Sequence, residues 1–406
     1  MPFTLAPIQF GTDGWRGVIA ADFTFARVCH LAPIAAQVLA ESYSHLAQNR
    51  LLIIGYDRRF LAEDFAQAAA EAVQAAGFNV YLANTYAPTP ALSWAVKAYS
   101  ALGALVLTAS HNPAQYLGLK VKGAFGGSVT RELTAKIESR LLSSETLSTE
   151  TPGELERFNP WDSYTQALAS KVDLSRIQSA IAQGKLGVFA DVMHGAAAGG
   201  LSRFLGEGVI EINADRDPLF GGNPPEPLPA YIPDLFRAIN QAKQNNQYPL
   251  RVGLVFDGDS DRVAAVDGEG NFLSSQVLIP ILIQHLVQHH GFSGEVVKTV
   301  SGSDLIPLVA QHYQQPLHET PIGYKYIAER MLETPVLVGG EESGGIGYGT
   351  HIPERDALLS ALYAIEAVVV AEKDLGMLYQ ELQAQVGFHS AYDRIDRKST
   401  RLNSSH

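Results

Sequence analysis

Ser110 lies where a short apolar segment changes into a polar turn. Residues 103–107 are small and apolar, which is typical of a strand buried in the centre of a sheet. Pro113 has no backbone N–H to donate, so it ends regular structure after the turn. Ser110 therefore follows the carboxyl end of a strand, where open α/β sheets hold ligands, and its hydroxyl is a candidate nucleophile. This segment alone fits a surface turn that contains a serine equally well.

Three aspartates, Asp257, Asp259 and Asp261, stand at alternate positions in a second polar turn after an apolar segment. Crowded carboxylates repel one another unless a cation neutralises them, and their oxygens suit hard cations such as Mg²⁺ or Ca²⁺. The start of an EF-hand loop has the same spacing, but Arg262 stands where that loop needs glycine, and Gly268 where it needs a bidentate glutamate. A solvated acidic turn is the remaining alternative.

A third apolar segment, residues 336–338, enters a glycine-rich polar loop that contains Glu341 and Ser343. Glycine allows backbone conformations that bring a loop close to a ligand. Glu341 and Ser343 could then point the same way and hydrogen-bond the hydroxyls of a sugar. Glycine-rich loops are often only turns, so this signal is weak by itself.

Taken together, these segments resemble the α-D-phosphohexomutase family, which includes phosphoglucomutases, phosphomannomutases and phosphoglucosamine mutases. Residues 108–113 are similar to the family's phosphoserine loop, 257–262 to its metal loop and 340–344 to its sugar-binding loop. Residues 10–17 are similar to its N-terminal signature. The four motifs follow one another in the family order, and the resemblance extends to about Tyr392.

The resemblance implies a role for each residue that matches a family motif. The implied catalytic residues are Ser110, Lys120, His111 and Arg16. The implied metal ligands are Ser110, Asp257, Asp259 and Asp261. The implied substrate-binding residues are Arg262, Gly323, Lys325, Glu341 and Ser343. Without the resemblance, Lys120 would be taken for a solvated surface lysine, and a structural hydrogen bond would explain His111 equally well.

The implied reaction interconverts hexose 1-phosphate and hexose 6-phosphate through a phosphoserine. Glucose is the first expectation, because Glu341-Glu342-Ser343 is most similar to the loop of glucose-type mutases. Phosphomannomutase and phosphoglucosamine mutase are alternatives, as are a phosphatase and an inactive sugar-phosphate-binding fragment. A phosphoserine carries roughly −1.5 to −2 charges beside three carboxylates, so one Mg²⁺ per chain is expected. A hexose bisphosphate is the implied intermediate and activator.

The composition of the 406-residue chain is that of a globular protein with more than one domain. Its net charge of −12 argues against nucleic acid as a partner. The single cysteine, Cys29, excludes an intrachain disulfide and fits a reducing, cytoplasmic compartment. No signal peptide is visible, and the apolar stretch 277–287 is too short to span a bilayer. We therefore expect a small sugar phosphate as partner, no membrane, and a monomer or weak dimer.

Three consecutive α/β domains with mostly parallel mixed sheets around a central cleft would position these motifs. Their expected limits are 1–150, 151–271 and 272–388, with residues 143–153 as a linker. The expected strands are 51–54, 80–82, 104–107, 186–190, 209–212, 252–256, 296–299 and 336–338. The expected helices are 64–76, 275–288 and 355–371.

The family places a fourth domain with a phosphate-binding loop after these three. Residues 389–406 are expected to be its truncated start, and the polar, aperiodic segment 397–406 resembles an artefact tail. The expectation from sequence is therefore that the fourth domain is missing and that anchoring of the substrate phosphate is incomplete.

Overall fold

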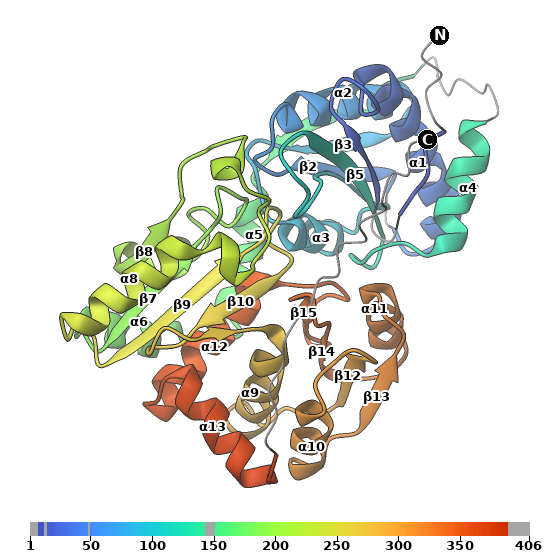
Figure 1. Ribbon diagram of the computed structural model, residues 1–406. Helices are drawn as coiled ribbons and strands as arrows, with labels where there is room; N and C mark the ends of the chain where they lie inside the picture. The colour runs from blue at the N-terminus through green and yellow to red at the C-terminus, as the bar shows by residue number, and fades with distance from the viewer. Residues whose placement is uncertain (1–6, 12–13, 48, 143–150, 389–406) are drawn as a thin grey trace, which may run out of the picture.

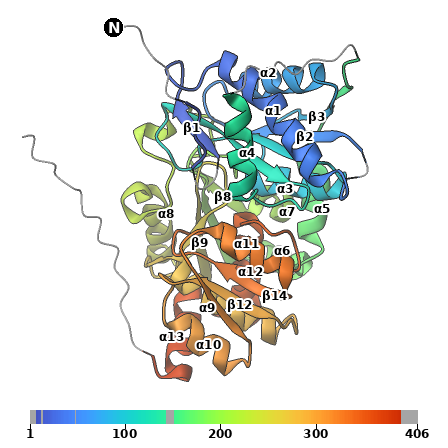
Figure 2. The same ribbon diagram turned by 90° about the vertical axis from the view of Figure 1, so that its right-hand side faces the viewer.

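The computed structural model describes residues 7–11, 14–47, 49–142 and 151–388, which form three α/β units in chain order (Figure 1). In Figure 1 and in the rotated view of Figure 2, the first unit (blue to teal) lies above the third (orange to red). The second unit (green to yellow) lies beside them in Figure 1. The expected fold class of consecutive α/β domains with mixed sheets is confirmed.

The first unit is built on a six-stranded sheet. Its strands are β1 (Trp15–Val18), β2 (Leu51–Tyr56), β3 (Asn79–Ala83), β4 (Gly103–Leu107), β5 (Tyr116–Gly123) and β6 (Leu155–Phe158). They lie in the order β1-β5-β4-β2-β3-β6, and β5 runs antiparallel to both of its neighbours. The helices are α1 (Phe25–Tyr43), α2 (Ala62–Ala75), α3 (Thr89–Ala98), α4 (Arg131–Leu141) and α5 (Pro160–Ala169).

The second unit contains a five-stranded sheet in the order β11-β10-β9-β7-β8. Its strands are β7 (Leu186–Asp191), β8 (Val209–Ile212), β9 (Leu250–Phe256), β10 (Val263–Val266) and β11 (Phe272–Leu273). Its α-helices are α6 (Leu174–Ala182), α7 (Ser202–Leu205) and α8 (Pro233–Gln244). Three short 3₁₀ turns are η1 (Gly206–Gly208), η2 (Phe220–Gly222) and η3 (Pro229–Tyr231).

The third unit contains a four-stranded sheet in the order β13-β12-β14-β15. Its strands are β12 (Glu295–Thr299), β13 (Leu317–Thr320), β14 (Val336–Gly340) and β15 (Ile346–Gly347). Its helices are α9 (Ser275–Gln288), α10 (Leu305–His312), α11 (Tyr324–Glu333), α12 (Ala357–Ala371) and α13 (Leu375–Val386).

One topology recurs in all three units. Three strands joined by helices form parallel pairs, with the first strand in the middle, as β4-β2-β3, β9-β7-β8 and β14-β12-β13. The third strand then enters a loop, and the chain returns as the antiparallel neighbour β5, β10 or β15. The loops are residues 108–115, 257–262 and 341–345. The candidate serine, the aspartates and the candidate sugar-binding pair Glu341 and Ser343 therefore occupy the same topological position in successive units.

Burial explains why the sequences of these strands are so continuously apolar. Every residue of β2 and of β4 is buried, as expected for strands covered on both faces. Helix α12 is buried along nearly all its length because it packs against α6 and β9 of the second unit and against α9 of its own. Its N-terminus is fixed by Asp356, whose side chain accepts a 2.9 Å hydrogen bond from the Leu359 N–H.

The expected elements are close to those observed, and the ranges 209–212 and 275–288 coincide with β8 and α9. The structure also contains many elements that were not expected, and two of them change how the first unit is understood. Strand β6 pairs with β3, so the first sheet continues past the expected limit at residue 150 to Phe158. Strand β5 occupies a segment for which no strand was expected, and its antiparallel pairing with β4 turns the serine segment into a hairpin loop.

Some expectations lie outside the described residues. These include residues 143–150 of the expected linker and residues 389–406, the expected start of a fourth domain. In the part of the chain that is described, no helix is both long and apolar enough to cross a membrane.

Candidate active site

Ser110 is held in a strained, almost fully buried position on the loop between β4 and β5. Its φ of 52° lies in the left-handed region, which a non-glycine residue seldom adopts. Its side chain donates a 2.8 Å hydrogen bond from Oγ to Oδ2 of Asp257, and Nδ1 of His111 lies 3.3 Å from the same Oγ. Its backbone N–H donates to Oγ1 of Thr108 at 2.9 Å. The hydroxyl is thus directed at the acidic loop of the second unit.

Arg59, which was not predicted from the sequence, holds the serine loop in place through hydrogen bonds to its backbone. Its guanidinium donates four hydrogen bonds of 2.6–3.1 Å to carbonyl oxygens, two from one nitrogen to Ser110 and Asn112 and two from the other to Pro113 and Tyr116. The side chain is 0 % exposed. A planar fork of donors suits this task better than a lysine ammonium would.

Asp57 connects Arg59 to the same loop. Its carboxylate lies 3.4 Å from the Arg59 Nε and accepts a 2.6 Å hydrogen bond from Thr108 Oγ1. Burial raises the pKa of Asp57 to about 6, although Arg59 and the Thr108 hydroxyl act to lower it. The Asp57-x-Arg59 segment follows β2 directly. An acidic and a basic residue at the end of an apolar strand is the sequence feature from which these two residues could have been predicted.

The three predicted aspartates converge on the loop between β9 and β10. Each of Asp257, Asp259 and Asp261 offers an oxygen within 4.8 Å of the others, and all three are 0 % exposed. Oδ1 of Asp257 accepts 3.1 Å hydrogen bonds from the N–H groups of Asp261 and Arg262, which fixes the turn. A Cβ atom on Gly258 would lie 2.4 Å from the Ser110 carbonyl oxygen, so glycine lets the two loops touch.

The charge of the cluster fits a hard cation. Burial, followed by repulsion from Asp259 and Asp261, raises the pKa of Asp257 well above its usual value. Oδ1 of Asp261 is buried and accepts no hydrogen bond from the described residues. Buried carboxylate oxygens that converge in this way are the donor set that Mg²⁺ prefers, and the residues present therefore fit such an ion.

Lys120 bridges the first and second units at this cluster. It lies on β5, and its Nζ is 2.8 Å from Oδ2 of Asp259 and 2.9 Å from Oδ2 of Asp261. The predicted catalytic lysine is thus brought to the aspartates, while its alternative as a solvated surface lysine is wrong, because it is 1 % exposed. Lys120 therefore forms ion pairs with two of the three carboxylates, those of Asp259 and Asp261.

Two further residues that contact the aspartates were not predicted. Thr89, at the start of α3, donates a 2.5 Å hydrogen bond from Oγ1 to Oδ2 of Asp259, and its N–H donates to the Asp259 carbonyl. Arg355, just before α12, lies 2.7 Å from Oδ2 of Asp261 and 3.6 Å from Oε2 of Glu341. These residues are distant in sequence, and no local pattern marks them.

A cavity of about 550 Å³ opens between the first and third units, with one residue of the second unit in its wall. Seven predicted site residues line it, namely Arg16, His111, Arg262, Gly323, Lys325, Glu341 and Ser343. An adjoining hollow of about 470 Å³ shares Lys325 and Ser128 with it. Ser110, Lys120 and the aspartates are not among the lining residues. The structure therefore separates the predicted residues into a buried charged group and a cavity-lining group.

The cavity-lining residues carry both signs of charge. The Arg16 guanidinium donates a 2.6 Å hydrogen bond to Asn112 of the serine loop. Burial lowers the pKa of His111 to about 3, with further contributions from Arg262 and Arg16, so this imidazole is neutral at pH 7. Burial raises the pKa of Glu341. With Arg16, Arg262 and Lys325 on its wall, the cavity can hold an anionic ligand.

The glycine-rich loop is anchored within the third unit. Glu342 accepts hydrogen bonds from Thr299 Oγ1 at 3.0 Å and from Ser301 Oγ at 2.6 Å. Gly323, at φ 128°, immediately precedes α11 and allows the turn that places Lys325 on the cavity wall. Glu341 and Ser343 face the same cavity, as the sequence had suggested.

Comparison with protein-family models gives three matches along the chain. Residues 7–148 match domain I of phosphoglucomutase/phosphomannomutase, residues 162–270 match domain II, and residues 274–386 match domain III, each described as an alpha/beta/alpha domain. The three matched ranges contain the serine loop, the aspartate loop and the glycine-rich loop, respectively.

Comparison with individual proteins gives the same family. A crystal structure of a protein named as a phosphomannomutase, from Thermus thermophilus, is 36 % identical, with a TM-score of 0.86 over 97 % of this chain and 87 % of that one. A phosphoglucomutase/phosphomannomutase of Thermococcus kodakarensis is 26 % identical over 92 % of this chain and 80 % of its own length. A phosphoglucosamine mutase of Desulforamulus reducens is 28 % identical over 93 % and 82 %.

Proposed function

The chain belongs to the phosphoglucomutase/phosphomannomutase family and is an enzyme of the phosphohexomutase type, and from this premise we propose the reaction that it catalyses. The proposed reaction interconverts hexose 1-phosphate and hexose 6-phosphate, with glucose as the sugar. The observation that carries it is the 2.8 Å contact between Ser110 and Asp257, because it joins a candidate nucleophile to a carboxylate cluster beside a cavity with charged side chains in its wall.

In the proposed reaction, Ser110 in its phosphorylated form transfers its phosphoryl group to a sugar hydroxyl. The P–Oγ bond of the serine breaks, a new P–O bond to the sugar forms, and the hydroxyl proton passes to a basic group. The product is a hexose bisphosphate, which returns its other phosphoryl group to Ser110 after it turns over in the cavity. Lys120, held by Asp259 and Asp261, is the proposed acid and base.

The proposed cofactor is one Mg²⁺ held by Asp257, Asp259, Asp261 and a phosphoryl oxygen on Ser110. When bound, Mg²⁺ supplies Lewis-acid stabilisation of charge on the phosphoryl group. Arg59 and Asp57 position the serine loop, while the neutral His111 hydrogen-bonds the serine side chain without adding charge.

The proposed recognition of the substrate is divided along the cavity wall. Arg262, Lys325 and Arg16 contact the phosphate groups, and Glu341 and Ser343 hydrogen-bond the sugar hydroxyls. Gly323 allows close approach of the backbone to the sugar. The expected partner is thus a small sugar phosphate, with the protein a monomer or a weak dimer.

Glucose is the proposed sugar on the basis of Glu341, Glu342 and Ser343. The relatives are named for glucose, mannose and glucosamine phosphates, so the experiment compares these substrates directly. Glucose 1-phosphate, mannose 1-phosphate and glucosamine 1-phosphate are each supplied with Mg²⁺ and a trace of hexose 1,6-bisphosphate. Formation of the 6-phosphate and release of free phosphate are followed in parallel.

We expect Mg²⁺-dependent formation of glucose 6-phosphate, with the highest kcat/KM for the glucose substrate and no matching release of phosphate. Phosphate release without isomerisation would show that the protein is a phosphatase and not a mutase. Faster turnover of mannose or glucosamine phosphate would support mutase activity but show that glucose is not the preferred sugar. No turnover of any of the three would contradict the proposed activity of this chain.

A further inference from the structure

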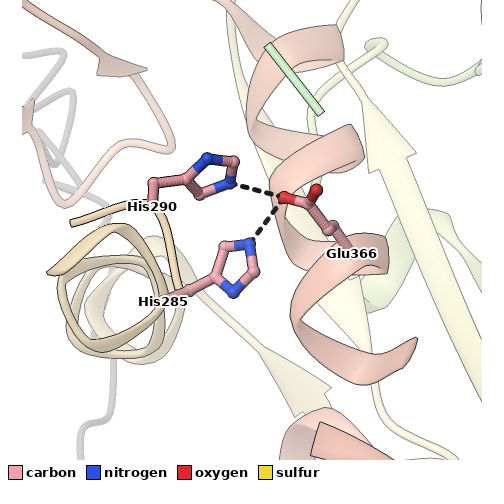
Figure 3. A group of neighbouring side chains, drawn as sticks. All are labelled: His285, His290 and Glu366. Carbon is pink, nitrogen blue, oxygen red and sulfur yellow. Dashed lines mark hydrogen bonds and ion pairs between the residues drawn. The ribbon is translucent and has the colours of Figure 1, made fainter. Parts of the chain in front are cut away.

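A second cluster of potential metal ligands lies away from the catalytic aspartates, between α9 and α12. It consists of His285 and His290, at and just beyond the end of α9, and Glu366 on α12 (Figure 3). Each offers one ligand atom, and these atoms lie within 4.8 Å of one another. Glu366 is ten positions after Asp356, the residue that caps α12, which corresponds to about 15 Å along the helix.

The carboxylate of Glu366 is the centre of this cluster. Its Oε2 lies 2.7 Å from Nε2 of His285 and 2.7 Å from Nε2 of His290, and both rings point toward it (Figure 3). A third imidazole, His289, has its Nε2 3.9 Å from Oε1. Three imidazoles therefore surround one carboxylate whose side chain is 1 % exposed.

We propose that His285, His290 and Glu366 bind a divalent transition-metal ion of the Zn²⁺ class, with His289 or water as the fourth ligand. Imidazole nitrogen and carboxylate oxygen are ordinary ligands of Zn²⁺, whereas the all-carboxylate cluster at Asp257 suits Mg²⁺. This site is independent of the mutase reaction proposed above.

The geometry needs a small adjustment to accept the ion. Zn–N and Zn–O bonds of about 2.0–2.2 Å in a tetrahedron separate the ligand atoms by roughly 3.3–3.5 Å. The two present separations of 2.7 Å from Oε2 are hydrogen bonds that must open by less than about 1 Å. Each ring can bind the ion through Nε2 when its proton lies on Nδ1.

An ion can reach the site from solvent. The side chain of His290 is 15 % exposed and that of His289 is 31 % exposed, while His285 and Glu366 form the buried side. Oε1 of Glu366 also accepts a 2.6 Å hydrogen bond from the N–H of Asp173, the residue that caps α6 of the second unit. A bound ion would therefore fasten the second unit to two helices of the third.

The test uses the full chain without a polyhistidine tag, stripped with EDTA and returned to buffer with excess Mg²⁺. Zn²⁺ is added, unbound ion is removed by gel filtration, and the metal content is measured. Co²⁺ is the spectroscopic probe, since imidazole ligation in a tetrahedron gives strong visible absorption bands. The variants are His285→Gln, His290→Gln and Glu366→Gln, with the exposed His30→Gln as a matched control.

We expect one retained Zn²⁺ per chain in the parent and in His30→Gln, and at least about tenfold weaker binding in each ligand variant, equivalent to about 1.4 kcal/mol. Zn²⁺ should raise the melting temperature of the parent but not of His290→Gln. The double variant Asp257→Asn/Asp259→Asn should retain the ion, because the catalytic aspartates are not its ligands.

Two results would overturn the proposal. One is a parent chain that retains no Zn²⁺ in excess Mg²⁺, which would leave the cluster as a hydrogen-bonded contact between helices. The other is a folded His290→Gln variant that binds Zn²⁺ as tightly as the parent. His290 lies at the rim, so this variant decides the matter even if the more buried His285→Gln fails to fold.

Discussion

At the scale of single residues, Ser110 and Asp257 share a hydrogen bond in a place that water hardly reaches. The pKa of Asp257 is raised by burial and by its two acidic neighbours, so this contact does not depend on a fully charged carboxylate. A phosphoryl group on Ser110 would add roughly two negative charges to the same place. A divalent cation bound by the aspartates would offset part of this added negative charge.

Ser110→Ala is expected to lower mutase kcat by about 10⁴-fold or more, because the group that carries the phosphoryl unit is absent. Intact-mass measurement should show phosphate on the active parent and none on the variant. Ser139→Ala, at an exposed position of α4, is the control and should keep both activity and phosphate. A variant at Ser110 that kept the parental rate would exclude this serine as the phosphoryl carrier.

Asp259→Asn should raise the Mg²⁺ concentration needed for half-maximal activity by at least about tenfold, because one anionic ligand is lost. The fold should persist, since an amide oxygen can still accept the hydrogen bond from Thr89. Asp215→Asn, at an exposed position of the same unit, is the matched control. An unchanged Mg²⁺ requirement at Asp259→Asn would show that the metal is held elsewhere.

At the scale of elements, the strand ends and their loops show what the sequence could reveal. Ser110, the aspartates and Glu341 were predictable, because polar residues directly after apolar strands form local patterns. Strand β5 alternates Leu117, Leu119 and Val121 with Lys120 and Lys122, which is a strand pattern, but lysines at alternate positions usually indicate a solvated face. Here that face is buried against carboxylates of the other units.

The long-range supports of the site could not be predicted in the same way. Arg59 and Arg355 lie far in sequence from the atoms that they contact, and the spacing of a single sequence does not encode such a contact. Thr89 could not be predicted either, because its partner Asp259 is far away in the sequence and follows a strand of another sheet. Strand β6 was missed because half of its residues are exposed, so it lacks the apolar run of the central strands.

Asp57, which contacts the loop between β4 and β5, makes the stability of the folded protein depend on pH. Its folded pKa of about 6 is above the value of 3.8 for the free side chain, so the folded chain binds the proton more tightly. This contribution to the free energy of unfolding is fully present below pH 3.8 and is lost as the pH rises through 6. At about 1.4 kcal/mol for each unit of difference between the two pKa values, it amounts to about 3 kcal/mol.

Asp57→Asn removes that titration. We therefore expect the parent to lose stability relative to the variant by up to about 3 kcal/mol between pH 4 and pH 7. Urea unfolding at several pH values in EDTA measures the difference. The exposed Asp64→Asn on α2 serves as the control and should follow the parent. A constant difference between parent and Asp57→Asn would refute the shifted pKa.

At the scale of the whole molecule, charged contacts tie the units together around the cavity. Lys122 on β5 forms a buried ion pair with Glu354, which precedes α12, and both side chains are at most 1 % exposed. Lys120 and Arg355 reach the aspartate loop from the first and third units, respectively. The three loops are thus held in place by the neighbouring units as well as by their own sheets.

Lys122→Met should destabilise the protein by about 3–5 kcal/mol, because it leaves the Glu354 charge buried without this partner. The double variant Lys122→Met/Glu354→Gln should recover part of that loss, since the uncompensated charge is removed. Arg140→Met is the control, because the Arg140–Glu41 pair is one-third or more exposed and should be worth no more than about 1 kcal/mol. Chemical denaturation compares all four proteins. Equal losses of unfolding free energy for Lys122→Met and Arg140→Met would show that the buried pair contributes no more to stability than the exposed one.

The recurrence of one topology in the three units bears on the history of this chain. The same order of strands, with a variable loop before the same antiparallel return strand, is what two successive tandem duplications of an ancestral module would leave. Loops tolerate change better than the buried strands that carry them. Each copy could therefore diverge separately, one loop toward a nucleophile, one toward a cation site and one toward sugar recognition, while the inherited scaffold kept them facing a shared centre.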